Sequence, residues 1–423
     1  MKNVVILSVF AFIFLFSSCK KDEIIIPPDP IEDEYSSATF NFNFDEVDPK
    51  VMPIFDAYMQ TYESAVNQDN WNYNSEYSLK NLNTIIFAYD SDNQNYEAIY
   101  MIDPPNGNYT GDDSNVFSTS STASDGAKII RVTDTNFLKE LIKVRLSGSS
   151  FGISKVNDKD FLYFFYDKSK YDKVLQPLDI MRAVGFFIHE GFHLVSQVNF
   201  TQPNNEHSSI RFNLPADYPA DSVSFSLIAA GMKMYEDILF EDVQNMDDYM
   251  KMYYILFKKL KELDTSGKNY IDGYYLFECW LEGSAEFTEY YMNRGSGVMN
   301  GDNQEIRYDN SLQEFKDLIT DEIDAGVPPT INYNGQDRVA YYAVAVETTY
   351  YKLGSATLFI LDNLGVDVYQ KLKTGENPYE MLEEYINANN ISINENEVYN
   401  NLKSQIDWEA TKTMMQDYIN LFN

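Results

Sequence analysis

The sequence predicts an α+β protein in which a strand-containing N-terminal half packs on a mainly helical half. Short runs of alternating or continuous apolar residues before residue 170 are typical of strands. After that point nearly every periodic segment has the spacing of a helix. The chain has 423 residues, of which 44% are hydrophobic and 15% aromatic, so it can bury a large core in one large or two moderate domains.

Residues 1–18 are predicted to be a signal peptide. An uncharged apolar stretch from Val4 to Ser18 follows a short basic start, and it is too short to span a membrane comfortably. The segment that ends at Cys19 resembles a bacterial lipobox, with Phe16 where leucine is usual. This resemblance implies that Cys19 becomes the lipid-modified N-terminus. The alternative is an ordinary secreted protein cleaved near Ser18.

Residues 19–38 are predicted to be a tether. The charged residues Lys20 to Glu23 resemble the tag that follows the lipidated cysteine in surface lipoproteins of the Bacteroidota. Three prolines among acidic residues then favour a stiff, solvated chain. We therefore expect a protein held to the bacterial outer membrane by its lipid anchor, with the folded part outside the cell.

Residues 39–169 are predicted to combine strands and helices. Strands are expected at 40–44, 84–89, 96–102, 128–132 and 161–166, and helices at 48–66 and 136–146. The second and third strands flank a polar stretch and favour a hairpin. Residues 103–126 are predicted to be a loop, and its acids Asp112, Asp113 and Asp125 lack the spacing of a calcium-binding loop.

Residues 170–423 are predicted to be mainly helical, with helices at 178–198, 226–241, 246–263 and 274–292. Pro177 precedes the first of these helices, a position at which proline is tolerated. Apolar residues surround this first helix on most faces, which is typical of a buried helix.

A motif for metal chemistry lies within this first helix. His189 and His193 are two of the three histidines in the chain, and they are four residues apart, so both imidazoles lie on one helix face. Glu190 lies between them. This is the H-E-x-x-H zinc pattern, in which the histidines bind Zn²⁺ and the glutamate is the general base. A metal would also compensate for burying these polar groups.

A catalytic zinc site usually needs a third protein ligand. The metzincin extension would require glycine at 196 and histidine at 199, but the chain has Ser196 and Asn199, which excludes it. The third histidine, His207, lies in a polar stretch that is predicted to be a surface loop. It could approach the site, but an ordinary exposed histidine is the favoured interpretation.

The segment Trp280-Leu281-Glu282-Gly283-Ser284-Ala285-Glu286-Phe287 supplies a better candidate. Together with the histidine motif it resembles the second element of gluzincin metallopeptidases, E-G-x-A-E-[FY]. The resemblance covers about residues 170–365 and implies a zincin-like fold for the helical half. It implies that Glu282 is the third zinc ligand and that Glu286 braces a zinc-bound histidine. The alternative is a solvated acidic face, which the surrounding apolar residues disfavour.

The long connection between the two motif elements is a departure from the family. Residues 194–281 separate them, and we interpret about 200–272 as an inserted helical hairpin whose ends lie close together. If this interpretation fails, Glu236 or Asp237 becomes a rival ligand.

Two further expectations come from the resemblance. Tyr351, three residues before Gly354, matches the tyrosine that stabilises the tetrahedral intermediate in gluzincin aminopeptidases. The strand at 161–166 matches the strand before the active-site helix, whose edge can pair with an extended substrate.

Composition limits the partners. The net charge of −33 disfavours nucleic acid, anionic lipid surfaces and strongly acidic substrates. Lipidation of Cys19 would leave Cys279 as the single thiol, which could approach the metal but is more typical of a buried structural cysteine. The sequence therefore predicts a lipid-anchored zinc metallopeptidase that acts on peptides or proteins. The alternative is a non-catalytic, zinc-containing lipoprotein for nutrient capture or adhesion.

Overall fold

The structure is a computed structural model of the chain. It describes residues 52–67, 71–73, 77–81, 84–90, 95–103, 116–117, 128–131, 151–156, 159–167, 177–210, 214–240, 245–293, 311–333, 336–347 and 349–422. The predicted signal peptide, Cys19, the tether, the first strand and the helix at 136–146 lie outside these residues.

The chain divides into two compact units. The first comprises residues 1–198 and 289–303, and the second comprises residues 199–288 and 304–423. The division falls within helix α8 (Leu276–Asn293), so one continuous helix contributes its last turn to the first unit and the rest to the second.

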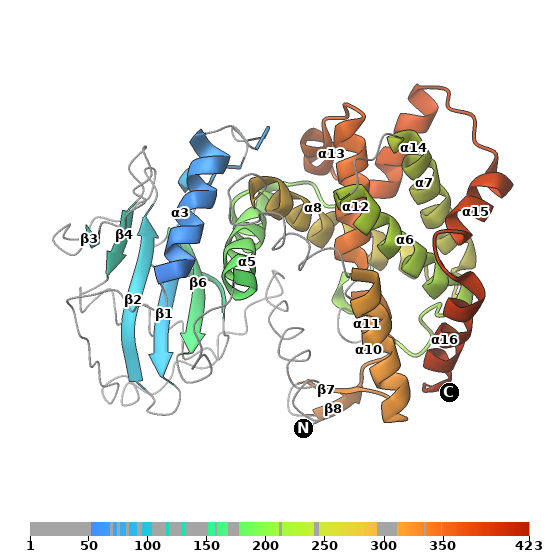
Figure 1. Ribbon diagram of the computed structural model, residues 1–423, viewed down its shortest axis with the longest axis horizontal. Coiled ribbons are helices and arrows are strands. Elements are labelled where there is room, and N and C mark those ends of the chain that lie inside the picture. Colours follow the sequence, from blue (N-terminus) through green and yellow to red (C-terminus); the bar gives the residue numbers. More distant parts are fainter. Residues whose placement is uncertain are drawn as a thin grey trace. The chain divides into compact units, whose positions relative to one another are not determined.

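A six-stranded sheet forms the base of the first unit, in the order β3-β4-β2-β1-β6-β5 (Figure 1). Its strands are β1 (Thr84–Asp90), β2 (Asn95–Asp103), β3 (Val116–Phe117), β4 (Lys128–Arg131), β5 (Phe151–Val156) and β6 (Lys159–Asp167). The predicted hairpin is confirmed, because β1 and β2 pair antiparallel with Thr84 opposite Ile102. Strands β1 and β6 pair in parallel, and the other pairs are antiparallel.

The strand before the motif helix has a neighbour on each side. Strand β6 matches the predicted segment 161–166, but it pairs with β1 along one side and with β5 along the other. Its backbone groups are therefore engaged within the sheet, and the expectation that its edge receives a substrate strand is wrong. The edge of the sheet next to β6 is β5, a short, glycine-containing strand at 151–156 that was not predicted.

Besides the last turn of α8, the described residues of the first unit include two α-helices. Helix α3 (Met52–Asn67) packs against α5 (Pro177–Val195), and α5 also contacts β6. The rings of Tyr58 and Phe187 meet edge to face at 6.1 Å between these helices. The hydroxyl of Tyr77 donates to the carbonyl oxygen of Ile188 at 3.1 Å, directly beside His189. Buried aromatic residues thus hold the motif helix in place.

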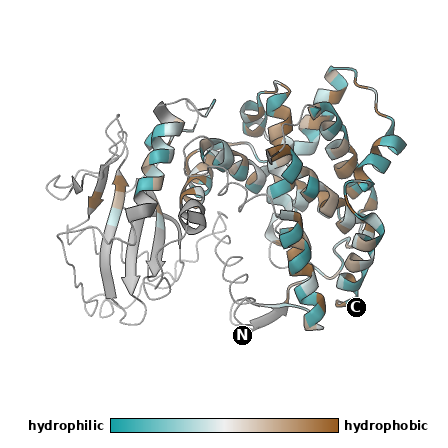
Figure 2. Ribbon diagram, viewed as in Figure 1, coloured by the Kyte–Doolittle hydropathy of each residue, from teal (hydrophilic) through white to brown (hydrophobic). Residues whose placement is uncertain are grey.

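The second unit is built from helices. They are α6 (Ser222–Phe240), α7 (Met246–Leu263), the first part of α8, α10 (Ser311–Ala325), α11 (Ala343–Glu347), α12 (Thr349–Asn363), α13 (Val368–Thr374), α14 (Pro378–Ala388), α15 (Glu395–Lys403) and α16 (Trp408–Asn420). A two-stranded sheet, β7 (Thr330–Tyr333) with β8 (Gln336–Val339), follows α10. Outer helices such as α10 and α16 have a hydrophilic and a hydrophobic side, which Figure 2 shows.

Helices α6 and α7 are the predicted hairpin at about 200–272, and they contact each other. They also contact α12, and α6 packs against α10 and α16. The hydroxyl of Tyr253 on α7 donates to the carbonyl oxygen of Gly231 on α6 at 2.8 Å. These helices therefore belong to the core of the second unit.

Helices α8 and α12 approach each other through glycines. A Cβ atom at Gly283 would lie 2.6 Å from the Cα atom of Gly354, and a Cβ atom at Gly354 would overlap the carbonyl oxygen of Cys279. Only glycine permits two backbones to come this close. The crossing fixes α12 beside Glu282, the residue before Gly283.

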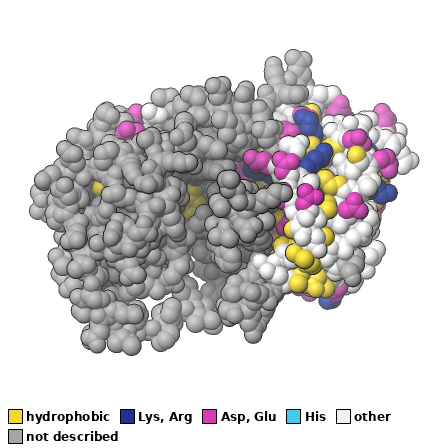
Figure 3. Space-filling model, turned by 60° about the horizontal axis from the view of Figure 1, so that its bottom comes forward, with side chains coloured by type: hydrophobic (Ala, Val, Ile, Leu, Met, Phe, Trp, Pro, Cys, Tyr) yellow, Lys and Arg dark blue, Asp and Glu magenta, His cyan; other side chains and the backbone are white. Residues whose placement is uncertain are grey.

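Helices dominate the described residues, and strands make up a small share. The prediction of a mainly helical second part is therefore confirmed for these residues. None of the described helices is both long and apolar enough to span a membrane. Asp and Glu side chains are scattered over the described surface of the second unit in Figure 3, in keeping with the acidic composition.

Replacing Gly354 by alanine should lower the free energy of unfolding by about 1–3 kcal/mol, the usual cost of overpacking a dense interior. The added methyl group meets backbone atoms of α8, which cannot move without shifting that helix. Urea-induced unfolding of the purified protein measures the change.

Gly231→Ala is the matched control, because Gly231 is also a buried helical glycine. Its Cβ atom would meet side-chain atoms of Leu256 and Leu353 at 2.9–3.2 Å, and these can rotate. Alanine also has the higher helix propensity. An equal or larger loss of stability at Gly231 would contradict the assigned importance of the α8–α12 crossing.

Candidate metal site

The histidine motif lies on α5, as predicted. Pro177 is the first residue of this helix, and no further proline interrupts it before Val195. His189, Glu190 and His193 are all buried. A buried carboxylate and two buried imidazoles cost free energy unless charged or polar partners compensate for the lost water.

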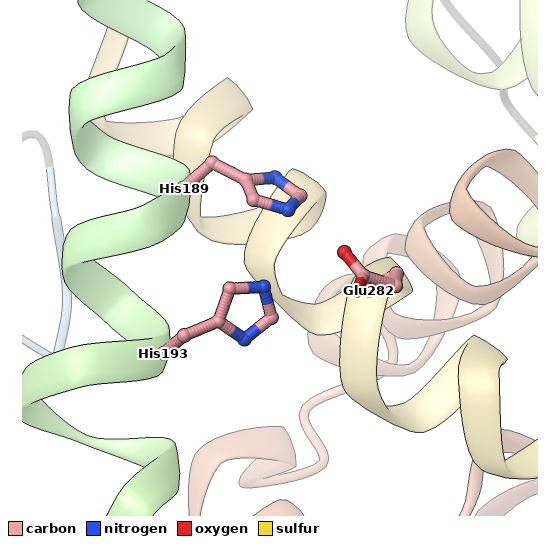
Figure 4. Close-up of side chains that lie close together, drawn as sticks. All are labelled: His189, His193 and Glu282. Carbon is pink, nitrogen blue, oxygen red and sulfur yellow. The ribbon is translucent and has the colours of Figure 1, made fainter. Parts of the chain in front are cut away.

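The structure brings His189, His193 and Glu282 together. One ligand atom from each residue lies within 4.8 Å of the corresponding atoms of the other two, and all three residues are buried. Figure 4 shows both imidazoles extending from α5 toward the carboxylate of Glu282 on α8. These residues could hold a metal ion, and Glu282 is therefore the third member of the group, as the E-G-x-A-E resemblance implied.

Gln197 orients the imidazole of His193. Its side-chain oxygen Oε1 lies within hydrogen-bond distance of Nδ1 of His193. With Oε1 as the acceptor, Nδ1 of His193 is the donor, and the lone pair that a metal ion could use is on Nε2. Gln197 was not among the site residues predicted from the sequence. Its position four residues after His193 was the available indication, since such residues share a helix face.

Glu286 has different partners from those predicted. Its Oε1 atom accepts hydrogen bonds from Tyr235 at 2.7 Å and from Lys352 at 2.6 Å. Within the described residues these contacts join α8 to α6 and α12. The carboxylate next to a motif histidine is that of Glu289, whose Oε2 atom lies 3.7 Å from Nδ1 of His189.

The rival ligands lie elsewhere. Glu236 accepts a hydrogen bond from the backbone N–H of Leu312 at the start of α10, at 2.7 Å. Asp237 forms an ion pair with Lys233 at 2.5 Å. The imidazole of His207 contacts the carbonyl oxygen of Lys268 at 2.6 Å. None of these three residues is part of the His189–His193–Glu282 group.

Cys279 is a buried thiol one turn before Glu282. Burial raises the pKa of the thiol well above its usual range, and Glu278 contributes to this shift. Metals bind the thiolate, so a thiol that stays protonated is a poor ligand. Cys279 lies outside the group, in agreement with the structural role that the sequence favoured.

Tyr351 lies in the first turn of α12 and is partly exposed. Its ring stacks on that of Tyr350 with centroids 5.0 Å apart. Tyr350 is buried, and its hydroxyl donates to Glu347 at 2.8 Å. Tyr351 shares a helix face with Gly354, the residue that contacts α8, because the two are three positions apart.

One turn of π-helix, Ile271–Tyr275, leads directly into α8. Such turns are often found at functional sites. Within this turn, Tyr274 donates to the buried carboxylate of Glu347 at 2.6 Å, and Tyr275 bonds to Thr349 at 2.9 Å. The turn thereby attaches the start of α8 to the α11–α12 region.

Comparisons of the chain with known protein families, with curated proteins and with solved structures find no match. The resemblance to gluzincins therefore rests on the motif residues of the sequence alone.

Replacing Glu282 by alanine should lower the metal content of the protein after incubation with zinc and removal of the unbound ion. Loss of one of three ligands leaves an incomplete site. Elemental analysis of the desalted protein measures the bound metal. Glu236→Ala is the control and should keep the wild-type content, because Glu236 contacts the start of α10. The reverse result would transfer the third ligand to α6.

Proposed function

We propose that this protein is a zinc metallopeptidase. The observation that carries the proposal is the convergence of the H-E-x-x-H histidines with Glu282, which lies on a different helix and far along the chain. Two imidazoles and one carboxylate are the protein ligands of a well-known class of catalytic zinc sites, which keep a fourth position for water.

Charge supports a divalent ion at this position. Glu190, Glu282 and Glu289 are each at most 3% exposed, and they lie on α5 and α8, the two helices that carry the three proposed ligands. Buried carboxylates need a positive partner or a proton. The donor set of nitrogen and oxygen atoms suits Zn²⁺, whereas Ca²⁺ and Mg²⁺ prefer oxygen ligands alone.

A zinc ion bound here would lower the pKa of a water molecule and polarise the scissile carbonyl group. The task of Glu190 is to accept a proton from that water and to pass it to the leaving amine. A protein that merely stores zinc does not need a carboxylate at this position, so the presence of Glu190 favours the enzyme over a zinc-containing binding protein.

Tyr351 is the proposed donor to the oxyanion. Its place one turn before the α8–α12 crossing supports this role, because the crossing lies next to Glu282. A phenol hydroxyl there would strengthen its hydrogen bond as the substrate carbonyl becomes tetrahedral.

The substrate we propose is a peptide or protein outside the cell. The lipobox-like segment before Cys19 supports export and anchoring at the outer membrane, and the net charge of −33 favours neutral or basic peptides over acidic ones.

Changing Glu190 to glutamine should abolish hydrolysis of a broad peptide library and leave the zinc content unchanged. The amide cannot accept the proton from water, but it keeps the size of the side chain. Mass spectrometry of the digested library and elemental analysis measure the two quantities. Hydrolysis near the wild-type rate would require another base.

Tyr351→Phe should reduce kcat by about a hundredfold or more, the usual effect of losing one oxyanion donor, and change KM little. The ring and its stacking on Tyr350 are preserved, so folding and zinc content should persist.

Tyr350→Phe is the matched control. It removes a buried hydrogen bond to Glu347 and should lower the Tm without a comparable loss of kcat. If Tyr350→Phe lost activity and Tyr351→Phe did not, the assignment would be wrong by one residue.

A further inference from the structure

We propose that Glu289 is the carboxylate that positions His189, and that Gly185 provides the space it needs. The inference rests on the proposed metal site and specifies how one of its ligands is oriented. Glu289 takes the role that the E-G-x-A-E resemblance implied for Glu286.

Glu289 lies on the correct face of α8. It follows Glu282 by seven residues, which is close to two helical turns, so both carboxylates project from nearly the same side. Its Oε2 atom is 3.7 Å from Nδ1 of His189, and both side chains are at most 4% exposed. A buried carboxylate beside a buried imidazole attracts the N–H proton strongly, because little water screens the interaction.

Gly185 lies one turn before His189 on α5. A Cβ atom at this position would overlap Oε1 of Glu289 and would lie 2.8 Å from its Cδ atom. Any larger residue would therefore displace the carboxylate from the place it occupies. Glycine is unfavourable in a helix interior, so its presence in α5 fits a requirement for space.

The carboxylate of Glu286 is bonded to residues away from the histidines. Lys352 and Tyr235 both donate to its Oε1 atom, and the ammonium group of Lys352 also lies over the ring of Tyr235 at 5.2 Å. A carboxylate with a lysine partner is neutralised there. Glu286 thus joins α6, α8 and α12, and Glu289 remains next to the histidine.

The consequence for the metal site is a fixed tautomer. A carboxylate 3.7 Å from Nδ1 favours the tautomer that carries its proton on this nitrogen, which leaves the lone pair of His189 on Nε2, the nitrogen on the other side of the ring. Gln197 has the same effect on His193. Both ligands would then present Nε2, one held by a carboxylate and the other by an amide oxygen.

A mutant cycle on zinc affinity tests the inference. We expect Glu289→Ala and Gly185→Ala each to raise the Kd for zinc by about ten- to a hundredfold, the usual effect of removing a partner of a metal ligand. In the Glu289→Ala background, Gly185→Ala should have no further effect, since no carboxylate remains to be displaced. Competition with a chromophoric chelator measures each Kd.

Gly185→Ala separates positioning from stability. Alanine favours the helix, and the group it would meet is the end of a flexible side chain, so the Tm of this variant should fall less than that of Glu286→Ala while its zinc affinity decreases. Glu286→Ala is the matched control on the same helix. It should lower the Tm through loss of the Lys352 pair and leave the zinc Kd near the wild-type value.

The outcomes are distinct. If Glu286→Ala weakens zinc binding and Glu289→Ala does not, the inference is overturned and the family pattern holds. If the Gly185 and Glu289 effects simply add, Gly185 does not act through Glu289. If the wild-type protein binds no zinc, the proposed function itself fails.

Discussion

The burial of Glu282, Glu286 and Glu289, three of the four buried carboxylates on α8, is the constraint on which the rest of the structure depends. Glu282, Glu286 and Glu289 are at most 4% exposed, and an unpaired charge in a protein interior costs several kcal/mol. Each has its own compensation in positively charged or protic groups. Glu286 forms an ion pair with Lys352 and accepts a hydrogen bond from Tyr235. Glu289 lies beside His189, and Glu282 lies beside His189 and His193. Helix α8 can therefore remain buried only where these partners surround it.

Much of the candidate metal site could be predicted from local spacing. His189 and His193 share a helix face because they are four residues apart, and the apolar residues around them predicted the buried helix on which they lie. Glu282 was found through the short motif that contains it. The hairpin β1–β2 and the helices α6 and α7 were also predicted, because each has a clear two-residue or helical periodicity.

The choice between Glu286 and Glu289 could not be predicted from the sequence. Both lie on the same side of α8 as Glu282, so helical spacing does not separate them. Lys352 pairs with Glu286, and the missing side chain of Gly185 leaves space for the carboxylate of Glu289. Both Lys352 and Gly185 are distant in the sequence from the glutamate that they contact. Strands β3, β5 and β7–β8 were missed because they are short and their sheet partners define them; β3 lies within the segment 103–126 that was predicted to be a loop.

X-ray absorption at the zinc edge of the loaded protein tests the three proposed ligands, because it identifies the atoms bound to the ion. We expect a first shell of nitrogen and oxygen at about 2.0–2.2 Å, with the outer-shell scattering of two imidazole rings. A sulfur scatterer at about 2.3 Å would implicate Cys279, and a shell without imidazole would place the zinc elsewhere. Either result would contradict the assignment of His189, His193 and Glu282 as the ligands.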